Sequence, residues 1–297
     1  MDYSKLANDE LIDLLFIEED RLPREAAEEI VRRGEELMLE LTGIVLDRVL
    51  WTAELPDWWA PVHATYLLGA IASEDAIVPL LSALRWSDAY DCEWVVEEIP
   101  SMFGTIGLVA REPLENIVAD RSAGWSARAM AMDSLAAIGL RSPEVEGEIM
   151  NMVANILSDE NEELGARRAA AVILLDFRRV ECKDALVSFA TEERERFKGD
   201  AKFDGVILPQ EVEKDLMMGG RDTDHYARNW LRFYEEVEIE ARQQRWAEED
   251  AKYRVHPQLD REDSTHSRPK AKQVRLEDPC PCGSGKKYRR CCWEKLH

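Results

Sequence analysis

Apolar residues recur along most of this chain at spacings of three and four residues, which is the period of an α-helix. Ile77, Leu80, Leu81 and Leu84 show the pattern on one face of a segment. Strand signals are scarce, since no Asn-Gly or Asp-Gly turn lies between runs of alternating apolar and polar residues. A proline that follows Ser142 marks a helix start. The sequence therefore predicts an all-α fold.

The helices are expected to come in repeated pairs. Four segments align at offsets of 35, 32 and 39 residues: Leu68–Ile71, Phe103–Ile106, Leu135–Ile138 and Leu174–Phe177. Each precedes a second amphipathic helix. Such a period is typical of an α-solenoid, in which stacked pairs share a continuous core. The small residues Gly69, Gly104 and Ala136 are predicted to let neighbouring helices approach closely.

The segment Trp59–Arg85 (WAPVHATYLLGAIASEDAIVPLLSALR) is the best single unit, with Pro79 early in its second helix. It resembles the HEAT-like repeats, including those of the phycobilin-lyase type, over roughly residues 24–195. The resemblance implies a HEAT-like α-solenoid of helix pairs. Pro100 departs from the pattern, and we expect a kink or a helix boundary there.

Composition changes along the chain predict three regions. Residues 1–253 form the helical repeat domain, with terminal capping helices within 1–22 and 225–253. Residues 254–276 have two prolines, many charges and no periodicity, as is usual in a flexible linker. Residues 277–297 hold a dense cysteine cluster.

Charge is divided between these regions. The net charge is −22, yet the segment 265–297 has nine basic residues against three acidic ones, so the preceding 264 residues carry −28. This balance argues against nucleic acid as a partner of the acidic body, because phosphate contacts need Lys and Arg. No apolar run approaches the ~20 residues that span a bilayer, and the acidic N-terminus is unlike a signal peptide. The sequence predicts a soluble, cytoplasmic protein without a membrane span.

The cysteine cluster predicts a zinc site. Its spacing is Cys-x-Cys, eight residues, then Cys-Cys, and its members are Cys280, Cys282, Cys291 and Cys292. Four thiolates complete the tetrahedral shell of zinc, with Zn–S distances of about 2.3 Å. Gly283 and Gly285 permit the sharp reversal that such a knuckle needs. A segment this short folds only if metal binding supplies the energy.

Other interpretations of the cluster stay open at this point. Disulfides or free redox thiols use the same residues, and His297 is an alternative fourth ligand in place of Cys292. The GSGKK stretch is not a phosphate loop, because it lacks the full Walker spacing and a preceding strand. A closed four-sulfur site also argues against zinc catalysis, which needs an open coordination position.

The sequence CPCGSGKKYRRCC resembles the SEC-C motif, which ends the preprotein translocase ATPase SecA and is appended to many bacterial proteins. The resemblance covers residues 277–297 and implies that the four cysteines are the zinc ligands. It departs from many SecA versions in having Cys291-Cys292 where those have Cys-His. In the family the segment is an interaction handle: the SecA version contacts the export chaperone SecB and is associated with ribosomes and phospholipid.

Basic residues surround the cysteines, and they have two interpretations. Four thiolates and one zinc leave a charge of −2, which nearby cations would offset; these are Lys286, Lys287, Arg289 and Arg290. Together with four linker bases they also form a strip able to dock on an acidic protein, rRNA or anionic lipid. The linker bases are Arg268, Lys270, Lys272 and Arg275.

Aromatic residues alternate with acids in the stretch RWSDAYDCEWVVEE. Trp86, Tyr90 and Trp94 are candidate contacts for a basic peptide in a groove. The alternative is that they pack between repeats beside a solvated acidic rim. His63, in the first helix of a repeat, is read as a packed or rim residue, since no catalytic constellation surrounds it in the sequence.

These observations predict a zinc-binding, non-enzymatic adaptor or scaffold. Its acidic helical surface and basic, zinc-held tail would each bind protein, with a SecB-like chaperone or the ribosome as candidate partners of the tail. The alternative is a lyase-type or other modifying enzyme whose site lies in the solenoid groove, around His63, acids and aromatics.

Overall fold

The described part of the chain is helical. The computed structural model describes residues 1–198 and 206–255, with side chains as far as Ala251. No strand occurs within those ranges, which confirms the all-α prediction. The chain divides into two compact units: the first joins residues 1–102 to those from Asn229 onward, and the second spans residues 103–228.

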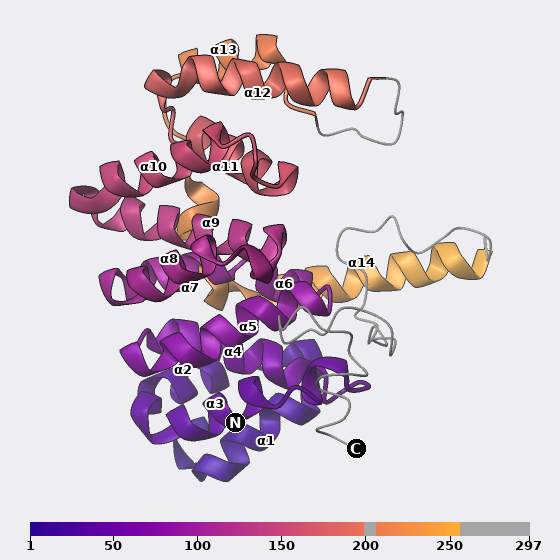
Figure 1. The fold of residues 1–297 in the computed structure, drawn as a ribbon. Helices are drawn as coiled ribbons and strands as arrows, with labels where there is room; N and C mark the ends of the chain where they lie inside the picture. Colours follow the sequence, from indigo (N-terminus) through magenta and orange to yellow (C-terminus); the bar gives the residue numbers. More distant parts are fainter. Residues whose placement is uncertain (199–205, 256–297) are drawn as a thin grey trace. The chain divides into compact units, whose positions relative to one another are not determined.

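The first unit takes its helices from both ends of the described chain (Figure 1). Its α-helices are α1 (Asn8–Ile17), α2 (Arg24–Arg33), α3 (Met38–Leu46), α4 (Trp59–Ile71), α5 (Ile77–Ala89), α6 (Glu93–Val96), the start of α7 (Ile99–Ile106) and α14 (Glu236–Val255). Its 3-10 turns are η1 (Tyr3–Lys5), η2 (Glu19–Arg21), η3 (Gly34–Leu37), η4 (Leu50–Thr52), η5 (Glu74–Ala76) and η10 (Trp230–Tyr234).

Helix α4 is the centre of the first unit. Every residue from Trp59 to Gly69 is buried, because the segment is apolar on nearly all faces and packs against α1, α2, α3 and α5. A Cβ atom on Gly69 would lie 2.5 Å from Cγ of Met102, so the glycine permits the close approach that the sequence predicts. Pro100 is the second residue of α7, which confirms the helix boundary expected there.

The closing helix of the first unit begins later than the sequence predicts. The expected helix over 225–253 is wrong at its start, since α14 begins at Glu236 and is preceded by η10. Trp230, Phe233 and Tyr234 are all buried within one short turn. A 3-10 turn places residues i and i+3 on one side, so it puts Trp230 and Phe233 on a common buried face.

The second unit follows the chain order more simply. It contains the end of α7, α8 (Arg111–Ala119), α9 (Trp125–Arg141), α10 (Pro143–Ser158), α11 (Leu164–Asp176), α12 (Lys183–Arg196) and α13 (Pro209–Met217). Its 3-10 turns are η6 (Leu108–Ala110), η7 (Arg121–Ala123), η8 (Val180–Cys182) and η9 (Asp224–Ala227).

Helix α9 has the central place in the second unit, where it packs against α8, α10 and α11. A Cβ atom on Gly104 would lie 2.9 Å from Cβ of Ala137, which again confirms a predicted close approach. Helix α10 starts at Pro143 directly after Ser142, as predicted, although the Ser142 side chain makes no capping hydrogen bond.

A buried arginine recurs in the second unit. Arg128 Nε donates to the carbonyl of Val118 at 2.8 Å, and Arg167 Nε donates to the carbonyl of Leu157 at 3.0 Å. Arg128 and Arg167 lie 39 residues apart, which is the last offset of the sequence repeat. Both guanidinium groups thus satisfy a carbonyl near the end of the preceding helix, where the backbone lacks partners. Two successive helix pairs share this local design.

None of the described helices is both long enough and apolar enough to cross a lipid bilayer.

Candidate functional site

The predicted zinc segment lies outside the described residues, together with the linker 254–276 apart from its first two residues. This holds for the four cysteine ligands and for Lys286, Lys287, Arg289 and Arg290. In the part of the chain that the structure describes, no group of three or more His, Cys, Asp or Glu side chains is placed to hold a metal ion.

The two cysteines of the helical body have an environment unlike that of a metal site. Cys92 is buried, and burial raises the pKa of its thiol to about 12. Burial also raises the pKa of Cys182, which is half-buried. Because the thiolate is the form that binds metal or attacks an electrophile, both side chains behave as small apolar residues.

His63 is locked inside the first unit. It is 0% exposed, with its Nε2 atom 2.5 Å from the carbonyl oxygen of Glu19 and its Nδ1 atom 3.1 Å from the hydroxyl of Tyr234. A carbonyl only accepts, so Nε2 donates the ring proton and the Tyr234 hydroxyl donates to Nδ1. Burial lowers the pKa of His63 to about 4, which keeps the ring neutral at pH 7. The prediction of a packed histidine is confirmed.

The three aromatic residues predicted to contact a partner lie within the packing of the first unit. Tyr90 is only 6% exposed. Trp86 and Trp94 are half-buried; Trp86 meets Trp51 edge to face at 6.2 Å between ring centroids, and Trp94 lies 5.8 Å from Trp59. The surface that these residues offer a partner is therefore limited to the outer edges of Trp86 and Trp94.

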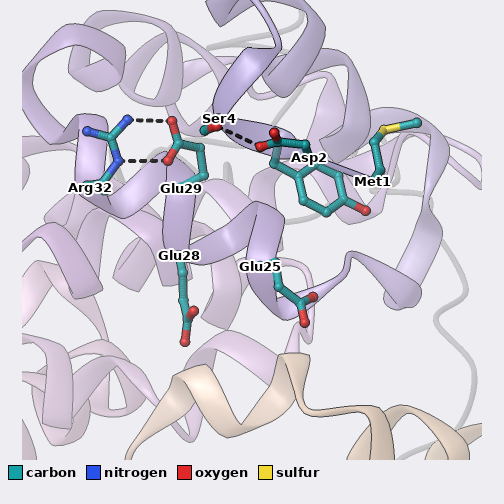
Figure 2. Close-up of a pocket in the computed structure, with 8 residues that line it drawn as sticks. Met1, Asp2, Ser4, Glu25, Glu28, Glu29 and Arg32 are labelled. Atoms are coloured by element: carbon teal, nitrogen blue, oxygen red, sulfur yellow. Dashed lines mark hydrogen bonds and ion pairs between the residues drawn. The ribbon is translucent and has the colours of Figure 1, made fainter.

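A pocket of about 360 Å³ opens on the first unit, at a place that the sequence analysis did not single out. Figure 2 shows the side chains around it, which come from the N-terminal turn and from α2. The lining residues are Met1, Asp2, Tyr3, Ser4, Glu25, Glu28, Glu29 and Arg32. Four of these eight carry a carboxylate, so the pocket is predominantly acidic. A sequence signal existed in the run REAAEE, which places acids one turn apart on a helix.

Ion pairs organise the carboxylates of this pocket. Glu29 accepts hydrogen bonds from Arg32 at 2.6 and 2.7 Å and from Arg33 at 2.8 Å. The hydrogen bonds from Arg32 contribute most, and together with the bond from Arg33 they lower the pKa of Glu29 to about 2. Arg24 lies 2.8 Å from Glu28.

Glu25, by contrast, is exposed at the same pocket and is close enough to help raise the pKa of Tyr3, for which burial is the larger cause. The pocket suits a cationic group that has an apolar stem, since Tyr3 and Met1 border the carboxylates.

Comparison with known proteins confirms one of the two resemblances. The SEC-C motif matches residues 278–294. The protein translocase subunit SecA of Helicobacter pylori is 30% identical over 113 residues, which is 37% of this chain and 12% of that protein. SecA of Francisella tularensis is 41% identical over 75 residues, and SecA of Dehalococcoides mccartyi is 71% identical over 24 residues.

These matches are short relative to the relatives themselves, since they cover between 2% and 12% of each SecA chain. No solved structure matches the chain. The comparisons therefore establish similarity to the SEC-C motif and to SecA, while the HEAT-like resemblance of residues 24–195 stays a prediction.

Proposed function

We propose that this protein is a zinc-binding, non-enzymatic adaptor that binds one partner through its C-terminal segment and a second through its helical body. The observation that carries the proposal is the SEC-C match at residues 278–294 at the end of a helical chain of opposite charge. Two binding regions joined by a linker allow both partners to be held at once, with the second contact made at a high effective concentration.

The proposed ligands of the zinc ion are Cys280, Cys282, Cys291 and Cys292. Support comes from the motif match and from the chemistry of four thiolates at this spacing. The described residues of the helical body include no group of side chains placed to hold a metal ion. Burial raises the pKa of Cys92 and Cys182, which favours the protonated thiol. Zinc in such a closed site orders the segment and does not act on a substrate.

The proposed partner of the tail is an acidic protein surface, of which a SecB-like chaperone is the first candidate and the ribosome the second. The relatives that match are subunits of a protein translocase. The contacts come from the bases beside the cysteines, and their strength should fall with salt because exposed charges are screened.

The helical body is proposed to act in the cytoplasm as a HEAT-like solenoid with an acidic surface. The pocket of the first unit supports this proposal, since Glu25 is exposed there beside Asp2 and Glu28, which pair with Lys5 and Arg24. The outer edges of Trp86 and Trp94 supply aromatic contacts on the same unit.

The enzyme alternative receives no support around His63. A modifying enzyme needs a cleft where the histidine meets substrate, yet this ring is fully buried and both of its nitrogens are bonded. Its neighbours Trp59 and Phe233 close the space around it, at 5.9 and 6.1 Å between ring centroids.

Metal analysis of purified protein tests the first half of the proposal. We expect one zinc per chain, lost in the double variant Cys280→Ser/Cys282→Ser. The matched control is Cys182→Ser, which removes a half-buried thiol from the body and should keep the zinc. Wild-type protein without zinc, prepared in reductant and never exposed to chelator, would overturn the assignment.

Binding to purified SecB and to purified ribosomes tests the second half. Changing Lys286, Lys287, Arg289 and Arg290 to Gln should keep the zinc and weaken binding at least tenfold at low salt. The control replaces four exposed bases of the body: Lys5, Arg196, Lys198 and Lys214. Equal loss in both variants would mean that total charge, and not the tail, determines binding. Binding to neither probe would remove both candidate partners.

A further inference from the structure

Helix α3 of the first unit is apolar on two opposite sides. One side is in the core, where Leu41, Ile44 and Val45 are buried. On the other side, Leu39 is 80% exposed and Leu46 is 41% exposed. A helix that is apolar all round is normally covered all round. The outer side of α3 therefore has the composition of a face that another element covers.

The exposed apolar residues of α3 follow the helix axis. Leu39, Gly43 and Leu46 are spaced four and three residues apart, so they lie on one side of the helix, and the two leucines are about 10 Å apart along the axis. A Cβ atom on Gly43 would meet no atom of a neighbouring element within 4 Å. Val49, which follows the end of α3, is 61% exposed. These residues form an uncovered apolar stripe.

Helix α5 packs against α3 and adds to this surface. The turn η5 also contacts α3, and it ends two residues before Val78, so this valine lies beside α3. Val78 is 65% exposed. The four exposed apolar side chains are called the apolar face: Leu39, Leu46, Val49 and Val78.

Exposed carboxylates border the apolar face, each within four residues of one of its members. They are Glu35, Glu36, Glu40, Asp47, Glu74 and Asp75. Among the described residues, none of these six has an ion-pair partner, whereas Glu28 and Glu29 of the acidic pocket are paired with arginines. Residues 35–49 and 74–85 contain these six acids and two bases, Arg48 and Arg85, so the net charge of this surface is −4.

The acidic border selects among possible occupants of the apolar face. A second copy of the chain would bring six carboxylates against six, and like charges across an interface oppose binding. Nucleic acid and anionic lipid are repelled for the same reason. The described secondary structure is all helical, so within those ranges no open strand edge is present to pair with an extended segment. A helix with an apolar stripe and basic flanks matches both the charge and the shape of this face.

We propose that the apolar face of α3 and α5 is the docking site for a basic amphipathic helix of a partner protein. The inference rests on the proposed binding role of the helical body, and it names the surface and the chemistry of the partner. Apolar side chains of the partner, spaced at i, i+3, i+4 and i+7, lie along Leu39 and Leu46. Its lysine and arginine side chains extend over the same surface to the carboxylates on either side.

A synthetic peptide tests this site on the full chain. The probe is an amphipathic helix of about 14 residues, with leucine on one face and lysine on the other. The control peptide has the same composition, with the leucines spread evenly around the helix. We expect the probe to bind and to slow hydrogen exchange of α3 amides, and the control peptide to bind at least tenfold more weakly. Absence of probe binding, or equal binding of the two peptides, would overturn the inference.

Variants of the apolar residues separate this face from the rest of the first unit. Leu39→Gln/Leu46→Gln keeps good helix formers in α3 and should weaken probe binding at least tenfold, because a few apolar anchors dominate such contacts. The matched control is Ile17→Gln on α1, which replaces another exposed apolar side chain and should bind the probe as the wild type does. Equal binding by the two variants would contradict the assignment.

Charge variants test the acidic border. Glu36→Gln/Glu40→Gln should weaken probe binding about threefold at low salt, because exposed ion pairs contribute modestly and are screened by salt. The control Asp13→Asn/Glu25→Gln removes two exposed carboxylates from other helices of the same unit and should have little effect. Equal losses would show that total charge, and not this face, determines binding.

The tail of the chain itself is the remaining rival occupant. If changing the four linker bases to Gln tightens probe binding tenfold, the tail already covers the face and the inference is wrong; unchanged binding supports it. None of these measurements depends on zinc or on SecB. Failure of the docking site therefore leaves the proposed role of the tail standing, and loss of zinc binding leaves the docking site standing.

Discussion

The two units of this protein are closed by consecutive parts of one segment, yet with opposite chemistry. In the first unit, Arg242 of α14 reaches the buried Asp20, with Nε 3.3 Å from Oδ2 and Nη2 donating to the Asp20 carbonyl at 2.9 Å. The same guanidinium lies 3.7 Å above the ring of Phe233. In the second unit, residues 218–228 bring His225 and Tyr226 to Asp176, with Nε2 of His225 3.4 Å and the Tyr226 hydroxyl 3.0 Å from Oδ2.

The difference shows how the surroundings of a histidine set the direction of its pH dependence. Arg242 and Asp20 form an ion pair, and burial lowers the pKa of the neighbouring His63 to about 4. In the second unit, the hydrogen bond with Asp176 raises the pKa of His225 above its usual value. A histidine buried away from acids therefore destabilises its unit at low pH, and a histidine with an acidic partner stabilises its unit there.

The largest expected loss of stability comes from breaking the ion pair between Arg242 and Asp20. Arg242→Met leaves Asp20 buried without its cation, so we expect a loss of ~3–5 kcal/mol from the first unit, as for other buried pairs that lose one partner. Urea unfolding followed by hydrogen exchange of α4 amides measures it. Arg245→Met, which removes an exposed arginine from the same helix, should cost little; similar losses in both variants would contradict the assignment.

The next effect is the opposite pH trend of the two units. Because the pKa of His63 is lowered to about 4, the unfolded chain binds the proton more tightly and acid destabilises the fold. Lowering the pH from 7 to 5 should cost the first unit ~2 kcal/mol, while protonation of His225 should strengthen its contact with Asp176 in the second unit. His63→Gln should remove this dependence in α4 amides, and His225→Gln should leave it intact. A parallel trend in both units would refute the comparison.

Glycine-to-alanine substitutions at close helix contacts should change the stability of the two units by smaller amounts. Gly104→Ala places a Cβ against Ala137 and its backbone, which cannot yield, so we expect a loss of ~1–3 kcal/mol from the second unit. Gly69→Ala meets the flexible side chain of Met102 and should cost less. Gly147→Ala, where no atom lies within 4 Å, should stabilise α10 by up to ~1 kcal/mol. Thermal unfolding ranks the three, and a different order would count against the packing described.

The smallest expected effect belongs to a single hydroxyl. Tyr226→Phe removes one hydrogen bond to Asp176 and should destabilise the packing of residues 218–228 by ~1 kcal/mol, without changing the exchange of α4 amides in the first unit. Hydrogen exchange of the Asp222 N–H, which donates to the carbonyl of Asp176, checks it. If this N–H is as protected in Tyr226→Phe as in the wild type, the hydroxyl does not hold the segment.

Local patterns in the sequence predicted a large part of this fold. The three- and four-residue spacing predicted helices, Pro100 and Pro143 lie at the helix starts expected for them, and Gly69 and Gly104 lie at close contacts. The start of the closing helix was predicted wrongly, at 225 in place of 236. Trp230, Phe233 and Tyr234 are buried by elements distant in the sequence, and helical periodicity within one segment does not show such tertiary contacts.

The candidate sites show the same difference between local sequence patterns and tertiary contacts. The SEC-C motif could be recognised from sequence because its cysteines, glycines and bases are neighbours along the chain. The acidic pocket could not, since Asp2 and Tyr3 join Glu25 and Glu28 only after α2 folds back beside the N-terminal turn. The sequence indicated that His63 is packed but not that its pKa is lowered, because a pKa depends on burial and neighbouring charge.

The amino-acid sequence by itself determined the helical class, the charge division and the SEC-C motif at residues 278–294, because each depends on residues close together in the chain. Only the tertiary structure decided that His63 is buried and neutral, that Arg242 pairs with Asp20, and that His225 and Tyr226 both contact Asp176. These residues are separated by tens to hundreds of positions, so their interaction energies exist only after the helices have packed.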